Sequence, residues 1–332
     1  MNTFDSVIHQ PKIVAHFRTV LESGRVPHAY ILQGERFSGK EYVARTFAAA
    51  LLCSGKEGEK PCGLCHSCIQ FASGNHPDFI TVRHEKPGVI SVQEIREQVV
   101  DTLEIAPYQS DRKVYMISES ELMRPEAQNA LLKSFEEPPA YAVIMLLTTD
   151  AEALLKTLRS RAVLLTMQPV PESEVRRYLM EEVKAPPERI EACVAFARGN
   201  VGKAKLLASN EEYEHLMDDA LGLLHEIKEL DASQISARVR AVSDAYKLGI
   251  RDYFDILSIW FRDVLYFKAA NDPNGLVLKE ELTGIRKMAS ESTYEGIEKV
   301  LDALSRAGKR IQANVNFDLA MELLLMTIRE NC

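Results

Sequence analysis

The first 167 residues alternate short apolar runs with segments whose apolar residues recur at helical spacing. Five apolar runs predict β-strands, at residues 29–34, 78–83, 113–118, 142–149 and 161–167. Helical spacing predicts three helices between them, at residues 39–52, 91–105 and 125–137. Because strands alternate with helices, we expect an α/β domain with a parallel sheet flanked by helices.

Start signals support two of these helices. Ser91 and Glu94 have the spacing of a capping box, in which each side chain bonds the other residue's backbone N–H. Pro125 stands in the first turn of the third predicted helix, where its missing N–H does no harm.

The pattern changes after residue 167. Two prolines in the stretch 168–175 indicate a boundary. Three short helical patterns with Pro or Gly punctuation follow, and from about residue 211 the patterns are long and helical. We therefore expect an α/β domain over 1–167, a small helical domain over 168–208 and an all-α domain over 209–332.

The composition is that of an ordinary globular protein, with 46% hydrophobic and 27% charged residues among 332. A net charge of −8 gives no global basic field. This argues against one alternative function, a nucleic-acid-binding module built on a zinc site of the kind described next. No apolar run reaches the roughly 18 residues of a membrane span. The N-terminus lacks the apolar core of a signal peptide, so we expect no membrane segment and a cytoplasmic protein.

Four cysteines are clustered as Cys53-x8-Cys62-x2-Cys65-x2-Cys68. Thiolates bind zinc tetrahedrally, and two C-x2-C turns can bring four sulfurs to one ion. We expect a structural zinc site in a loop module over 53–68. Unbound or disulfide-bonded thiols and an iron–sulfur cluster are the alternatives, and His66 could replace one ligand.

Residues 34–40 follow the Walker A spacing, Gly34-x4-Gly39-Lys40, between a predicted strand and a predicted helix. In a working loop the backbone N–H groups and the lysine bind phosphates, and a following Ser or Thr binds Mg²⁺. Here that residue is Glu41, whose carboxylate repels phosphate oxygens.

The strand at 113–118 is the candidate Walker B strand. Such a strand ends in an Asp that helps to hold Mg²⁺, and a Glu that polarises water follows. Here the two residues are Ser118 and Glu119. The two positions that would bind Mg²⁺ are thus both altered, to Glu41 and Ser118. We therefore expect Gly34, Gly39 and Lys40 to form a degenerate phosphate loop. Bound ATP or ADP without hydrolysis remains open.

Arg161, in the stretch LRSRA at 158–162, is a candidate arginine finger that acts in trans on the γ-phosphate of a neighbour. The alternative is a surface or ion-pair arginine.

Five segments of the sequence follow one another from the N-terminus in this order: HAYILQG, the cysteine cluster, NHPDF, NALLKSFEEPP and TLRSRA. Together they resemble the bacterial DNA polymerase III clamp-loader subunits of the AAA+ class, strongly through about residue 208. In this family the gamma/tau type is the ATPase motor, and the delta-prime type has decayed nucleotide motifs. Glu41 and Ser118 match the delta-prime type, whereas an active gamma/tau-like ATPase is the alternative.

Two further positions bear on this assignment. Gly202 replaces the sensor arginine of gamma-type chains, and Ala162 replaces the cysteine of the family's Ser-Arg-Cys segment. The resemblance implies an AAA+ module, a helical lid over 168–208 and an oligomerising collar over 209–332.

It also implies a hetero-pentamer with gamma/tau and delta subunits, acting on a sliding clamp and primer–template DNA. We expect no ATPase activity from this chain itself. The resemblance implies that the chain is one component of the DNA-directed DNA polymerase holoenzyme, which is a nucleotidyltransferase.

Overall fold

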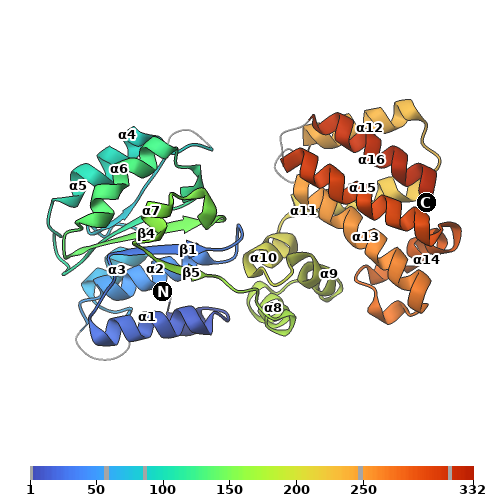
Figure 1. The fold of residues 1–332 in the computed structure, drawn as a ribbon. Helices are drawn as coiled ribbons and strands as arrows, with labels where there is room; N and C mark the ends of the chain where they lie inside the picture. The colour runs from blue at the N-terminus through green and yellow to red at the C-terminus, as the bar shows by residue number, and fades with distance from the viewer. Residues whose placement is uncertain (1–2, 56–59, 85–87, 246–249, 313–315) are drawn as a thin grey trace. The chain divides into compact units, whose positions relative to one another are not determined.

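A computed structural model describes residues 3–55, 60–84, 88–245, 250–312 and 316–332 (Figure 1). The chain divides into two compact units, one of residues 1–175 with 199–203 and the other of residues 176–198 with 204–332. Within the described ranges, no helix is both long enough and apolar enough to cross a membrane.

The first unit is built on a five-stranded parallel sheet in the order β2-β3-β4-β1-β5. The strands are β1 (Ala29–Gln33), β2 (Phe79–Thr81), β3 (Lys113–Ile117), β4 (Ala142–Thr148) and β5 (Val163–Thr166). All five predicted strands are therefore confirmed, and so is the parallel α/β class. Every residue of β3 and β4 is buried, which agrees with the nearly continuous apolar runs in the sequence.

Helices cover both faces of the sheet (Figure 1). The helices are α1 (Pro11–Ser23), α2 (Lys40–Leu52), α3 (His66–Ala72), α4 (Val92–Ile95), α5 (Asp101–Leu103), α6 (Pro125–Glu136) and α7 (Lys156–Arg159). α1 and α2 pack with Tyr30 and Leu32 on one face, and α4 to α7 pack with Ala29 and Ile31 on the other. One strand thus contributes alternate side chains to two cores.

The predicted helix starts are confirmed, and three helices are additions. Ser91 and Glu94 form the expected capping box, and Pro125 is the first residue of α6. The predicted helix 91–105 runs through α4, a π-turn at Arg96–Val100 and α5. The sequence analysis did not predict α1, the seven-residue α3 or the four-residue α7.

The second unit contains helices and loops and no strand among its described residues. Its helices are α8 (Glu172–Tyr178), α9 (Pro187–Ala197), α10 (Val201–Ser209), α11 (Glu211–Glu226), α12 (Ala232–Ala245), α13 (Ile250–Ala270), α14 (Leu282–Glu291), α15 (Tyr294–Gln312) and α16 (Phe317–Asn331), of which α8 and α10 start in the first unit. Trp260, fully buried on α13, donates its indole N–H to Met288 Sδ at 3.0 Å. This agrees with the predicted helical character of the chain after residue 167.

Candidate functional site

The carboxyl ends of parallel strands meet at one edge of the sheet, and the predicted phosphate loop lies at this edge. Loop 34–39 follows β1, and the Gly34 N–H bonds the Thr148 carbonyl at the end of β4, 3.0 Å away. Ser118 and Glu119 form the turn after β3. The fold therefore brings the predicted phosphate loop, Ser118 and Glu119 to the same edge.

Lys40, the first residue of α2, folds back onto its own loop. Its Nζ donates to the carbonyl oxygens of Gly34 and Glu35, at 3.1 and 3.0 Å. Burial lowers the pKa of the Lys40 ammonium, while the negative charges of Glu121 and Glu119 oppose that shift. Two of the three N–H donors of the Lys40 ammonium are thus occupied within the loop.

Carboxylates gather around this lysine. The negative charges of Glu121, Glu119 and Glu41 all raise the pKa of Lys40, and the positive charge of Arg36 lowers it. Glu121 Oε1 also accepts from the Thr149 N–H and hydroxyl, at 3.2 and 2.7 Å. The sequence analysis missed Glu121, although its place two residues after Glu119 was a usable signal. The three carboxylates thus outnumber the two cations, Lys40 and Arg36.

Segment 199–203 holds the loop from outside. Asn200 donates its side-chain amide to the Arg36 carbonyl at 2.8 Å and to Glu35 Oε2 at 3.2 Å. A β-carbon on Gly202 would lie 2.3 Å from the Phe37 carbonyl oxygen. Gly202 thus packs against the loop at the position that the resemblance assigns to a sensor arginine, and in this arrangement no side chain fits there.

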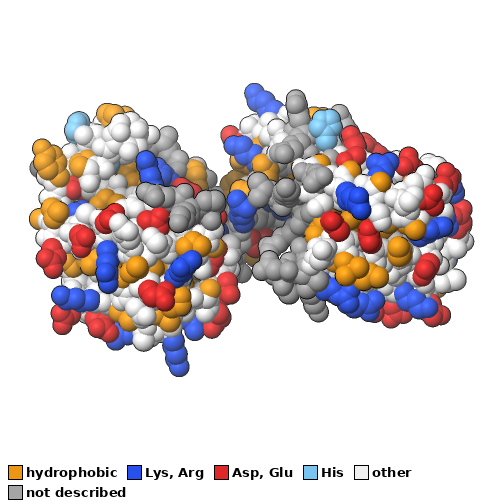
Figure 2. Space-filling model, turned by 90° about the horizontal axis from the view of Figure 1, so that it is seen from above, with side chains coloured by type: hydrophobic (Ala, Val, Ile, Leu, Met, Phe, Trp, Pro, Cys, Tyr) orange, Lys and Arg blue, Asp and Glu red, His pale blue; other side chains and the backbone are white. Residues whose placement is uncertain are grey.

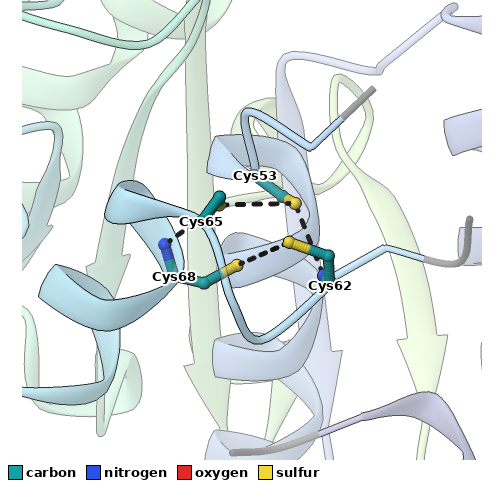
Figure 3. A group of neighbouring side chains, drawn as sticks. All are labelled: Cys53, Cys62, Cys65 and Cys68. Carbon is teal, nitrogen blue, oxygen red and sulfur yellow. Dashed lines mark hydrogen bonds between the residues drawn. The ribbon is translucent and has the colours of Figure 1, made fainter. Parts of the chain in front are cut away.

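The four clustered cysteines lie together, as the spacing predicted (Figure 3). All four sulfurs lie within 4.8 Å of one another. Cys53 and Cys65 Sγ are 3.9 Å apart, and Cys62 and Cys68 Sγ are 4.0 Å apart. A tetrahedron with Zn–S bonds of about 2.3 Å has edges of about 3.8 Å. The group can therefore hold a metal ion, and its dimensions are consistent with zinc.

Helix ends, and not the loop alone, position these sulfurs. Cys53 caps the C-terminus of α2 and Cys65 caps the N-terminus of α3, where its sulfur accepts the Cys68 N–H at 3.4 Å. The predicted loop is corrected to this extent, because Cys68 lies in the first turn of α3. Residues 56–59 of the module lie outside the described residues.

The thiol chemistry agrees with a metal site. All six cysteines are free, which excludes the disulfide alternative. Burial acts to raise the pKa of Cys65, but hydrogen bonds from Ser54 and Cys68 outweigh it and lower this pKa to about 5. In contrast, burial raises the pKa of the Cys53 and Cys68 thiols, and a bound metal ion would lower it. His66 is not among the grouped ligands and is exposed on α3.

Arg161 lies at the opposite edge of the sheet from the phosphate loop. It directly precedes β5, whereas loop 34–39 follows the carboxyl end of β1. Its Nη2 lies 3.0 Å from Glu136 Oε1, and its Nη1 donates to the Thr157 carbonyl at 3.0 Å. The structure therefore keeps Arg161 away from the loop of its own chain.

The NHPDF stretch has a structural task. The Asp78 carboxylate, buried before β2, accepts the backbone N–H groups of Tyr108, Gln109 and Ser110. His76 is also buried, and its Nδ1 accepts the Asp78 N–H at 3.1 Å. These two side chains anchor the loop between α5 and β3.

The surface charges are mixed. On the face shown in Figure 2, basic and acidic side chains alternate over both units, without a continuous basic surface. This agrees with the net charge of −8.

Comparison with known proteins identifies the family. Residues 9–171 match the family described as "DNA polymerase III, delta subunit". The chain is 26% identical over 328 residues to DNA polymerase III subunit delta' of Bacillus subtilis, covering 97% of this chain and 96% of that one. It is 30% identical over 310 residues to the subunit delta' of Pseudomonas aeruginosa, covering 90% of each.

A second type of subunit is also similar. The tau/gamma subunit of Haemophilus influenzae is 33% identical over 177 residues, which cover 53% of this chain but only 25% of that protein. The delta' relatives, by contrast, match over nearly their whole length. The chain therefore belongs to the delta-prime subunit family of DNA polymerase III.

Proposed function

We propose that this chain is a clamp-loader subunit that does not hydrolyse ATP itself and that completes the ATP site of a neighbour. Its partners would be gamma/tau and delta subunits in a hetero-pentamer, which would load a sliding clamp onto primer–template DNA in the cytoplasm. Family membership supports the assembly, because the relatives are DNA polymerase III subunits.

The state of loop 34–39 is the observation that carries the silent-site part. Lys40 bonds the loop's own carbonyls, three carboxylates act on its charge, and Gly202 packs against Phe37. Ser118 adds no negative charge for Mg²⁺. Each feature opposes binding of a magnesium–nucleotide complex, so we expect Gly34, Gly39 and Lys40 to serve the fold.

Titration calorimetry of the purified chain with ATP, with and without Mg²⁺, tests this part. We expect no binding heat and no ATP turnover, in the wild type and in Lys40→Ala alike. Turnover that Lys40→Ala abolishes would instead establish the alternative, an active gamma/tau-like ATPase, with which the partial match to a tau/gamma chain is compatible.

Arg161 is our candidate for the trans-acting arginine finger. Its side chain is 37% exposed and lies at the sheet edge away from its own phosphate loop, as a group that serves another subunit requires. In a reconstituted loader we expect Arg161→Ala to lower the DNA-stimulated ATPase rate by about 10³-fold, the lower end for arginine fingers. An unchanged rate would contradict the role.

The remaining assignments follow the family pattern. Cys53, Cys62, Cys65 and Cys68 would hold one structural zinc ion, since all four positions of a tetrahedral ion would be filled by protein ligands. The AAA+ module would span 1–167, the helical lid 168–208 and the oligomerising collar 209–332.

A further inference from the structure

Two neighbouring arginines in the segment 158–162 are paired with different glutamates. Arg159 pairs with Glu152, seven residues away in the chain. Arg161 pairs with Glu136, the last residue of α6, at 3.0 Å. Arg161 also has a hydrogen bond within this segment, from Nη1 to the Thr157 carbonyl at 3.0 Å.

We propose that Glu136 is the positioning residue of Arg161 and holds its guanidinium in the orientation that reaches the neighbour's γ-phosphate. This inference rests on the trans role proposed for Arg161. Glu136 Oε1 pairs with Nη2 and the Thr157 carbonyl accepts from Nη1, so the two contacts restrain both terminal nitrogens of the guanidinium. The Thr157 bond engages one of its five N–H donors, and the others remain for Glu136 and for phosphate oxygens.

The surroundings suit positioning better than stabilisation. Phe135 and Ser134 are buried and fix the end of α6, from which Glu136 projects with its side chain half exposed. An ion pair this exposed contributes little to folding stability. Orientation matters far more to rate, because a 1 Å misplacement of a reacting group can cost about 10²-fold.

The test uses loaders reconstituted with gamma/tau and delta subunits and purified as complexes. Glu136→Ala should lower kcat of the DNA-stimulated ATPase by about tenfold, within the range that misplacement causes. The KM for ATP should stay unchanged, because the motor subunit still binds the nucleotide. Glu136→Gln, which keeps an acceptor oxygen without the charge, should restore part of the rate.

Matched variants give the controls. Glu137→Ala changes the next exposed carboxylate, and Glu152→Ala breaks the pair of Arg159. Both should leave kcat at the wild-type value. Thermal unfolding of the isolated chains should show equal midpoints, which excludes a general loss of structure.

A double-mutant comparison separates the possible failures. With Arg161 already replaced by Ala, Glu136→Ala should have no further effect. An equal effect in both backgrounds would overturn the inference, because Glu136 would then act elsewhere. If Arg161→Ala lowers kcat and Glu136→Ala does not, only the positioning inference fails. If Arg161→Ala itself has no effect, the proposed finger fails and the inference fails with it.

Discussion

The backbone carbonyl of Phe37 lies 2.3 Å from the position that a β-carbon on Gly202 would occupy. Loop 34–39 and the start of α10 therefore meet where glycine alone fits. The sensor arginine of gamma-type chains could not enter this position without displacing the loop. The contact links two parts of the first unit that lie far apart in the sequence, and it explains why residue 202 is a glycine.

Replacing Gly202 by Ala should destabilise the chain. Alanine favours a helix interior over glycine by about 1 kcal/mol, but overpacking typically costs about 1–3 kcal/mol. We expect the overpacking to dominate and the urea midpoint to fall. Gly222→Ala is the matched control, because a β-carbon at this α11 position meets nothing within 4 Å. A stabilised Gly202→Ala chain would show that the loop yields easily.

Removing the metal should unfold the zinc module. α3 has seven residues, and its N-terminus is capped by the sulfur of Cys65, so it depends on the cluster. We expect about one zinc per chain by elemental analysis, less than a tenth of this in Cys62→Ser, and a lower unfolding temperature after chelation. Cys193→Ala should retain the metal, since Cys193 lies outside the cluster. Zinc-free wild-type protein with the same unfolding temperature would contradict this expectation.

Asp78 should contribute strongly to stability. Its buried carboxylate accepts three backbone N–H groups, and its removal leaves those donors unsatisfied. We expect Asp78→Ala to lower the free energy of unfolding by about 3 kcal/mol or more, as hydrogen bonds to a charged group are worth about 1.5–3 kcal/mol each. Urea unfolding measures the loss. Asp101→Ala, on an exposed carboxylate of α5, should change stability by less than about 0.5 kcal/mol.

His76 should make stability depend on pH in mildly acidic solution. Burial lowers the pKa of His76, against the opposing charge of Asp78, and His66 lowers it further. Because the folded pKa lies below the unfolded value of about 6.5, stability is fully present above that pH and is lost as pH falls towards the folded pKa.

The slope in the free energy of unfolding should reach at most about 1.4 kcal/mol per pH unit for this one proton. Urea unfolding between pH 8 and pH 5 should show a smaller slope for His76→Gln than for the wild type. The exposed His215→Gln should behave as the wild type does. Equal slopes for His76→Gln and the wild type would refute the assignment.

Local patterns in the sequence predicted the sheet well, because its three central strands, β3, β4 and β1, are buried and mostly apolar runs. The cysteine spacing predicted the cluster for a similar reason, since its ligands are near in sequence. By contrast, α3 begins at a hydrogen bond to the Cys65 sulfur, which helix propensity does not describe. The contacts of Glu136 with Arg161 and of Phe37 with Gly202 join residues far apart in sequence, and only the fold brings them together.

Helix α2 begins at Lys40 in the phosphate loop and ends at the cap residue Cys53, so one rod of about 20 Å joins the two motifs. An insertion or deletion of one residue within this rod would turn Cys53 by about 100° relative to Lys40. The sulfur could not then face the other three while the loop kept its place. The cysteine cluster therefore sets a length requirement on α2, which constrains the helix even when the loop binds no nucleotide.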